Sequence, residues 1–184
     1  MDNHFKQVGY VSTEGGPLLV GDYKVLTKWN GCETEDYDTL LEDCMAPEDC
    51  IYNVEKQEIV VWEPEGGAII SIHKDDKNNL ILIKSFEDIR KNNKYVGCIG
   101  KDETIIGQIE ISSEAILVIY ATESGALLEP LIGDEVTRLT GGLVFGDSAL
   151  AIPIPNGTYH CVADFVFGSN DELYQAKRLL LRRA

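Results

Sequence analysis

The chain has 184 residues, 44% of them hydrophobic, and this length and composition predict one globular domain over residues 1–184. It carries 31 acidic and 16 basic side chains, which gives a net charge of −15. A surface this acidic repels nucleic acids and anionic membranes, and it favours a basic partner.

Three features of the sequence indicate the cellular compartment of the protein. No apolar run reaches the roughly 20 residues that a membrane-spanning helix needs. The stretch MDNHFKQVGYVSTEGG lacks the basic segment and following apolar segment of a secretory signal. The five cysteines are odd in number and form no CxxC pair, which is typical of free thiols in a reducing compartment. We therefore expect a cytoplasmic protein without disulfides.

Glycine pairs precede apolar runs in three stretches: EGGPLLVGDY from Glu14, EGGAIIS from Glu65 and TGGLVFG from Thr140. A phosphate-binding glycine loop requires a helix after the glycines, whereas these runs are typical of strands. Neither GxxxxGK[ST] nor GxGxxG occurs in the chain. We therefore interpret each pair as a turn that leads into a strand, with a positive φ at Gly15 or Gly16.

An acidic window follows, because the chain from Asn30 to Glu55 holds no lysine or arginine. Within it, DYDTLLEDC predicts one or two helical turns. A charge run is usually a solvated face, but it can also dock a basic protein, with acids that speed encounter and an aromatic anchor that holds the complex. On the docking hypothesis, the partner-binding residues are Trp29, Glu33, Glu35, Asp36, Tyr37, Asp38, Glu42 and Asp43.

The middle of the chain predicts mostly strands. EIVVW is a strand over residues 58–62, and ISIH and LILIK flank the polar loop KDDKNN as a β-hairpin. SFEDIRKN, over residues 85–92, has the cap and charge pattern of a short helix. TIIGQIEIS and EAILVIYAT are rich in β-branched residues and predict two more strands.

The last third of the chain contains the clearest alternation. In TYHCVADFVFG, Tyr159 and Cys161 share one face of a strand, and His160 and Val162 share the other. The final segment, ELYQAKRLLLRRA, is compatible with a strand or a short helix. The predicted fold class is mainly β, an α+β protein with minor helix, whose antiparallel sheets form a sandwich-like or open barrel-like structure.

Signatures of catalysis are absent from the sequence. The three histidines, His4, His73 and His160, belong to no HExxH or spaced Cys/His zinc pattern, and no EF-hand loop occurs. We therefore predict no catalytic residue, no metal and no cofactor. The competing hypothesis is a small metal-dependent hydrolase or nucleotide-binding enzyme on a β-scaffold, with Asp75 and Asp76 as candidate cation ligands.

Several short motifs resemble the bacterial immunity protein 21 family. They are VSTEGGPLLV, Trp29 with Gly31, the DYD triplet from Asp36, EIVVW followed by Glu63, and the late segment IPIPNGTYHCVADF. Together they are spread over most of the chain, and the stretch from about Cys98 to Gly142 lies outside the resemblance.

The resemblance implies a non-enzymatic antidote. Immunity proteins of this kind are encoded beside polymorphic or contact-dependent toxins and bind the cognate toxin domain. The acidity of this chain suggests that such a toxin is basic, as nucleases are, because nucleases must neutralise phosphates. The toxin, the binding face and the oligomeric state stay open at this point.

Overall fold

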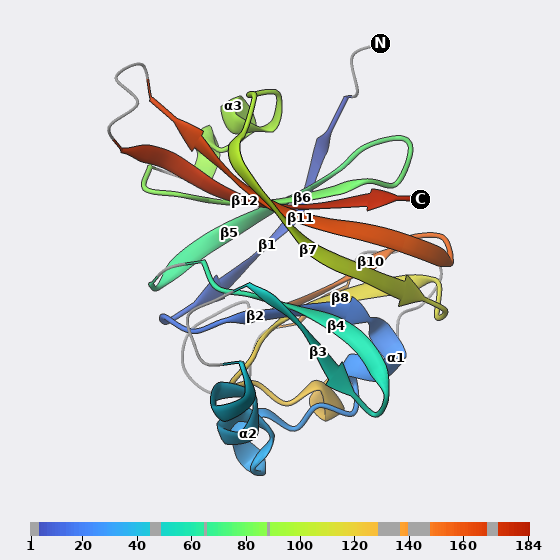
Figure 1. The fold of residues 1–184 in the computed structure, drawn as a ribbon. Helices are drawn as coiled ribbons and strands as arrows, with labels where there is room; N and C mark the ends of the chain where they lie inside the picture. The colour runs from blue at the N-terminus through green and yellow to red at the C-terminus, as the bar shows by residue number, and fades with distance from the viewer. Residues whose placement is uncertain are drawn as a thin grey trace.

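The fold is a sandwich of two antiparallel sheets (Figure 1), seen in a computed structural model of the chain. The structure describes residues 4–44, 49–64, 66–87, 89–128, 137–139, 148–168 and 173–184. The predicted turn at TGGLVFG therefore lies outside the described residues. The prediction of a mainly β, antiparallel, sandwich-like fold is confirmed.

Among the described residues, the first sheet has six strands. In spatial order they are β1 (Lys6–Thr13), β5 (Ala68–Lys74), β6 (Leu80–Ser85), β12 (Tyr174–Arg183), β11 (Gly157–Phe167) and β7 (Lys101–Ile111). The second sheet, in spatial order, consists of β3 (Cys50–Val54), β4 (Gln57–Trp62), β2 (Leu18–Asp22), β8 (Ala115–Tyr120), β10 (Ala149–Pro153) and β9 (Thr137–Leu139).

Short helices cover the outer faces of the sandwich (Figure 1). The α-helices are α1 (Tyr23–Leu26), α2 (Asp36–Asp43) and α3 (Asn93–Val96), and the 3₁₀ turns are η1 (Gly31–Glu33), η2 (Ile89–Lys91) and η3 (Gly125–Leu127). Helices α1 and α2 lie against the second sheet, and α3 lies against the first.

Three apolar layers follow from the alternation of side chains along the strands. The central layer lies between the sheets and includes Trp62, Tyr159 and Leu179. The second layer joins the outer face of the second sheet to α1 and α2. A smaller third layer, which includes Tyr95, lies between the first sheet and α3.

Two glycine pairs meet at one corner of the sandwich. The chain passes from β1 to β2 at Gly15 and Gly16, and from β4 to β5 at Gly66 and Gly67, so each pair changes sheet. The φ angles of Gly15 and Gly66 are +118° and +85°, values that side chains disfavour. A Cβ on Gly15 would lie 3.4 Å from the backbone nitrogen of Gly67. The prediction that these glycines turn into strands is confirmed for both pairs.

Most of the predicted elements are present, and one is displaced. The hairpin forms as β5 and β6, and EIVVW lies in β4. The helix predicted over residues 85–92 is wrong at its start, because Ser85 ends β6; among the described residues of this stretch, Ile89–Lys91 form a 3₁₀ turn. Pairing with β12 extends the strand, since the Phe86 N–H donates to the Gln175 carbonyl at 3.4 Å. The C-terminal segment is a strand, β12.

A buried polar network lies on the outer face of the first sheet. The Asn92 amide donates to Ser71 Oγ at 2.9 Å, and Ser71 Oγ lies 3.0 Å from His73 Nε2. Which of the two groups donates in this hydrogen bond depends on the tautomer of the imidazole. His73 has no exposed surface, and burial lowers the pKa of its ring from 6.5 to about 4.

We expect Gly15→Ala to lower the free energy of unfolding by about 1–3 kcal/mol, because alanine would have to adopt the left-handed φ of Gly15. Gly97→Ala is the matched control, since Gly97 has a φ of −92° and no atom within 4 Å of the place of a Cβ. Urea unfolding measures both variants. Equal stability of Gly15→Ala and the wild type would contradict the requirement for glycine at this corner.

We expect His73 to make folding pH-dependent. Below pH 6.5 the unfolded chain takes up a proton that the folded ring accepts only near pH 4, so stability is complete above pH 6.5 and falls towards pH 4. The loss is about 3 kcal/mol at most. NMR titration of the His73 ring measures its pKa directly, and unfolding of His73→Gln should depend less on pH than unfolding of the control His160→Gln. A His73 ring that titrates near 6.5 would contradict this account.

Candidate functional site

The acidic window folds onto the outer face of the second sheet. Helix α2 buries Leu40 completely, and Tyr37 and Cys44 pack against the same apolar layer. The opposite face of α2 is turned away from the sheet. The sequence thus produces a helix with one apolar side and one acidic side, held at the lower end of the molecule in Figure 1.

Trp29 lies in the core beneath this helix. Its side chain is 2% exposed, and its indole N–H donates to the Ala121 carbonyl at 2.8 Å. Trp29 was predicted as a partner-binding residue, but in this structure its role is structural. A partner at the surface would sense Trp29 only through the segment that it fixes.

Asp36 and Tyr37 combine partial exposure with structural contacts. Asp36 Oδ2 accepts hydrogen bonds from the backbone N–H and the side-chain amide of Asn30, at 3.0 and 3.3 Å. These bonds tie the start of α2 to the loop before η1. The pKa of the Tyr37 hydroxyl is raised, mainly by burial and then by the neighbouring Tyr120. Both residues help to build the surface as well as to present it.

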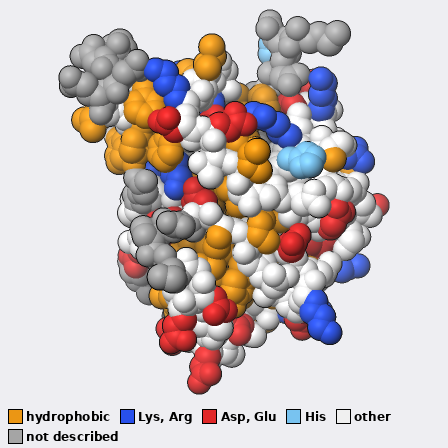
Figure 2. All heavy atoms as spheres, in the orientation of Figure 1, with side chains coloured by type: hydrophobic (Ala, Val, Ile, Leu, Met, Phe, Trp, Pro, Cys, Tyr) orange, Lys and Arg blue, Asp and Glu red, His pale blue; other side chains and the backbone are white. Residues whose placement is uncertain are grey.

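The other five predicted residues are exposed acids: Glu33, Glu35, Asp38, Glu42 and Asp43. Glu35, Asp38 and Glu42 recur at helical spacing, so they form a strip along the outward side of α2. Figure 2 shows red acidic side chains gathered over this end of the molecule. The structure therefore brings these acids together on one surface, which we call the α2 acidic face.

Two of these acids lie at the end of α2 where a negative charge destabilises the helix. Glu42 and Asp43 occupy the last turn of α2, where the carbonyl ends of the helix favour cations. Asp38 and Glu42, four residues apart, add repulsion between like charges. Folding alone gains nothing from this arrangement.

The structure adds Glu123 and Tyr52 to the α2 acidic face, two residues that sequence reasoning missed. The Cys32 N–H donates to the Thr122 carbonyl at 3.0 Å, which brings Glu123 beside η1. The pKa of the Cys32 thiol is raised by its partial burial and by the charges of Asp38 and Glu123. Tyr52 on β3 lies within the electrostatic reach of Asp43 and Asp36. Neither addition had a local sequence signal, since both depend on contacts between separate elements.

One acid of the window is used elsewhere. Asp49 forms an ion pair with Lys177 at 3.0 Å, and the two side chains are 11% and 6% exposed. Lys177 also donates to the Glu63 carbonyl at 2.6 Å, so this pair joins the ends of β3 and β4 to β12. Asp49 is a link between the two sheets, and a partner at the α2 acidic face would not reach it.

The proposed cation site of the competing hypothesis has a structural explanation. Asp75 is buried, and its Oδ1 accepts the backbone N–H groups of Lys77 and Asn79 at 2.9 and 2.8 Å. Its Oδ2 accepts the Asn79 amide at 2.8 Å. These bonds shape the loop between β5 and β6. Within the described residues, no three His, Cys, Asp or Glu side chains are grouped as a metal ion would require.

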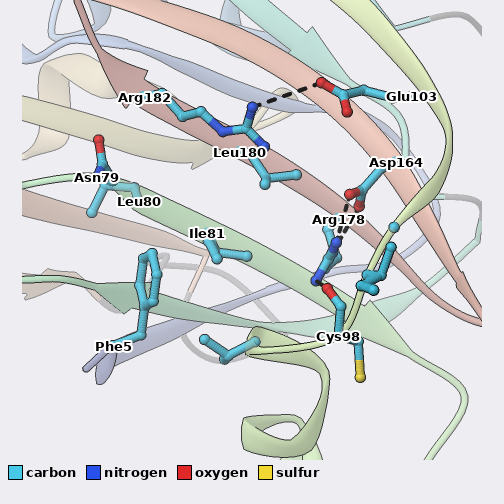
Figure 3. Close-up of a pocket in the computed structure, with 13 residues that line it drawn as sticks. Phe5, Asn79, Leu80, Ile81, Cys98, Glu103, Asp164, Arg178, Leu180 and Arg182 are labelled. Atoms are coloured by element: carbon cyan, nitrogen blue, oxygen red, sulfur yellow. Dashed lines mark hydrogen bonds and ion pairs between the residues drawn. The ribbon is translucent and has the colours of Figure 1, made fainter. Parts of the chain in front are cut away.

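A pocket of about 430 Å³ opens on the outer face of the first sheet (Figure 3). On its floor the Arg178 guanidinium and the Asp164 carboxylate form two hydrogen bonds of 2.7 and 2.5 Å. Arg178 Nη1 also donates to the carbonyls of Tyr95 and Cys98, at 2.6 and 3.0 Å. Arg182 and Glu103 form a looser pair of 3.7 Å at the rim.

The floor of this pocket serves the fold. Arg178 and Asp164 are 3% and 5% exposed in their side chains, so a ligand could reach little of either. Gly100 covers the pair, because a Cβ there would lie 1.8 Å from Asp164 Oδ2. The ion pair thus fastens the loop after α3 onto the first sheet.

Comparisons with protein-family models, with curated proteins and with solved structures found no match. None of the helices in the described part of the chain is long and apolar enough to cross a bilayer.

We expect Asp164→Ala to lower the free energy of unfolding by about 3–5 kcal/mol, because it leaves the buried Arg178 charge without its carboxylate. Glu103→Ala is the control, since it breaks an ion pair whose side chains are about half exposed, and it should cost at most about 1 kcal/mol. Thermal and urea unfolding measure both. Equal losses for the two variants would contradict the structural role of the buried pair.

Proposed function

We propose that this chain is a cytoplasmic immunity protein, without enzymatic activity, that binds and neutralises a cognate bacterial toxin domain. The α2 acidic face is the surface that contacts the toxin. The observation that carries the proposal is the strip of Glu35, Asp38 and Glu42 on the outward side of a helix that contains no basic residue. The resemblance of the sequence to the immunity protein 21 family points to the same function.

The charges support a basic partner. The chain has a net charge of −15, and the exposed acids of α2 add a local concentration of negative charge. Such a surface accelerates encounter with a basic protein and repels acidic competitors. Nucleases that act on DNA or RNA are basic where they contact phosphates, so a nuclease domain is the toxin class that this face fits best.

Half-buried tyrosines give the face its anchors. Tyr37 and Tyr52 are both partly exposed and pack partly against the apolar layer beneath α2. Tyrosine is enriched among the residues that dominate binding energy, because one ring offers a large rigid area and a polar tip. The acids around these rings would raise the association rate of the toxin, and the rings would lower its dissociation rate.

The positions of Glu42 and Asp43 also support a role for α2 in binding, because these acids do not stabilise the helix itself. Acids in the last turn weaken the helix, and a basic residue there would strengthen it. A docked basic partner removes this conflict, since its cations would lie against the carbonyl end of α2. Binding would therefore stabilise the helix that presents the site.

We expect the variant Glu33→Gln, Glu35→Gln, Asp38→Asn, Glu42→Gln to associate with the toxin domain encoded by the neighbouring gene about tenfold more slowly at low salt. Its association rate should also depend less on salt, while its dissociation rate changes little. Asp36 is left intact because it holds Asn30. Stopped-flow or surface-based kinetics at two salt concentrations provide the measurement.

A charge-matched control is available on the first sheet. Asp102→Asn, Glu103→Gln, Glu110→Gln, Glu114→Gln changes the net charge by the same amount at exposed positions of β7 and the turn after it. This control should associate at nearly the wild-type rate. Equal slowing of both folded variants would show that total charge matters and the α2 acidic face does not. No binding of the wild type to that toxin domain would contradict the proposed function itself.

A further inference from the structure

Two cysteine sulfurs meet at the end of α2. Cys44 directly follows the helix, and Cys50 is the first residue of β3. Their Sγ atoms lie 3.0 Å apart, and both residues are partly exposed. Cys44 and Cys50 pack against the same apolar layer of the second sheet, so the fold itself holds the two thiols together.

The other three thiols have different surroundings. Cys161 is buried in the central layer, and burial raises its pKa to about 12. Cys32 is exposed, but partial burial of its sulfur and two nearby acids raise the pKa of its thiol. The thiol of Cys98 donates to the Lys94 carbonyl at 3.1 Å, on the far side of the sandwich. Each of these features disfavours oxidation to a disulfide.

We propose that Cys44 and Cys50 are a reversible oxidation site that forms an intramolecular disulfide when a peroxide is present. One thiol loses its proton, the thiolate attacks an oxygen of hydrogen peroxide, and the O–O bond breaks; the leaving hydroxide takes up that proton, so a sulfenic acid and water result. The second thiol loses its proton and attacks the sulfenic sulfur, the S–S bond forms, and the S–O bond breaks; the leaving hydroxide takes up the proton of the second thiol and departs as a second water. Each sulfur loses one electron overall, and hydrogen peroxide accepts both.

The bond would act as a clamp on α2. Its last turn carries Glu42 and Asp43, which weaken the carbonyl end of the helix. A link from Cys44 to β3 would hold this turn against the second sheet, so the helix end would open less often. The clamp bears on the proposed function because α2 carries the acidic face, but the disulfide forms or fails to form whether or not a toxin binds.

The test uses the full-length, reduced chain treated with hydrogen peroxide, then denatured and alkylated without reductant. We expect the number of alkylated thiols to fall from five to three, and dithiothreitol to restore all five. Trypsin leaves Cys32, Cys44 and Cys50 in one peptide, residues 29–56, because the chain has no lysine or arginine between them. Fragmentation of that peptide locates the bond.

Single variants make the assignment specific. Cys32→Ser and Cys98→Ser should still form the disulfide, whereas Cys44→Ser and Cys50→Ser should not. Hydrogen exchange of the α2 amides should slow on oxidation of the wild type and stay unchanged in Cys44→Ser. Five alkylated thiols after peroxide, a bond that includes Cys32, or an intermolecular dimer in place of the internal bond would each overturn the proposal.

Discussion

The close crossing of two chain segments at one corner is the constraint on which the sandwich depends. At Gly15–Gly16 and Gly66–Gly67 the chain changes sheet twice, and the two backbones approach closely, since a Cβ on Gly67 would lie 3.2 Å from the Glu14 carbonyl. This crossing places β1 beside β5 in one sheet and β2 beside β4 in the other. The apolar faces of both sheets then meet across the central layer.

The position of the acidic face follows from that arrangement. With one face of the second sheet buried between the sheets, its other face requires a cover, and α1, η1 and α2 provide it. Two hydrogen bonds fix the segment before α2. The Trp29 indole donates to the Ala121 carbonyl, and the Asn30 backbone N–H donates to the Asp36 carboxylate. The exposed acids are thereby presented on a helix that is fastened at its start, and the Cys44–Cys50 contact lies at its less stable end.

Local pattern predicted much of the fold, and long-range contacts decided the rest. Alternation and turn residues were enough for the β5–β6 hairpin and for β11, since their pairing is local or their pattern unambiguous. For the candidate site, the acidic window could be found by composition, but the separate roles of its residues could not. The Trp29 indole donates to a residue 92 positions away, and Asp49 is paired with one 128 positions away. Only a tertiary structure distinguishes such acids and aromatics from those that face solvent.

Zero-length cross-linking tests the docking of a basic toxin domain at the α2 acidic face most directly. Carbodiimide joins a carboxylate to a lysine only where the two are in contact, and peptide mass spectrometry of the complex identifies the carboxylates. The account predicts cross-links from Glu35, Asp38 or Glu42 to lysines of the toxin domain. Cross-links confined to other acids, such as Glu103 at the pocket of the first sheet, would contradict it.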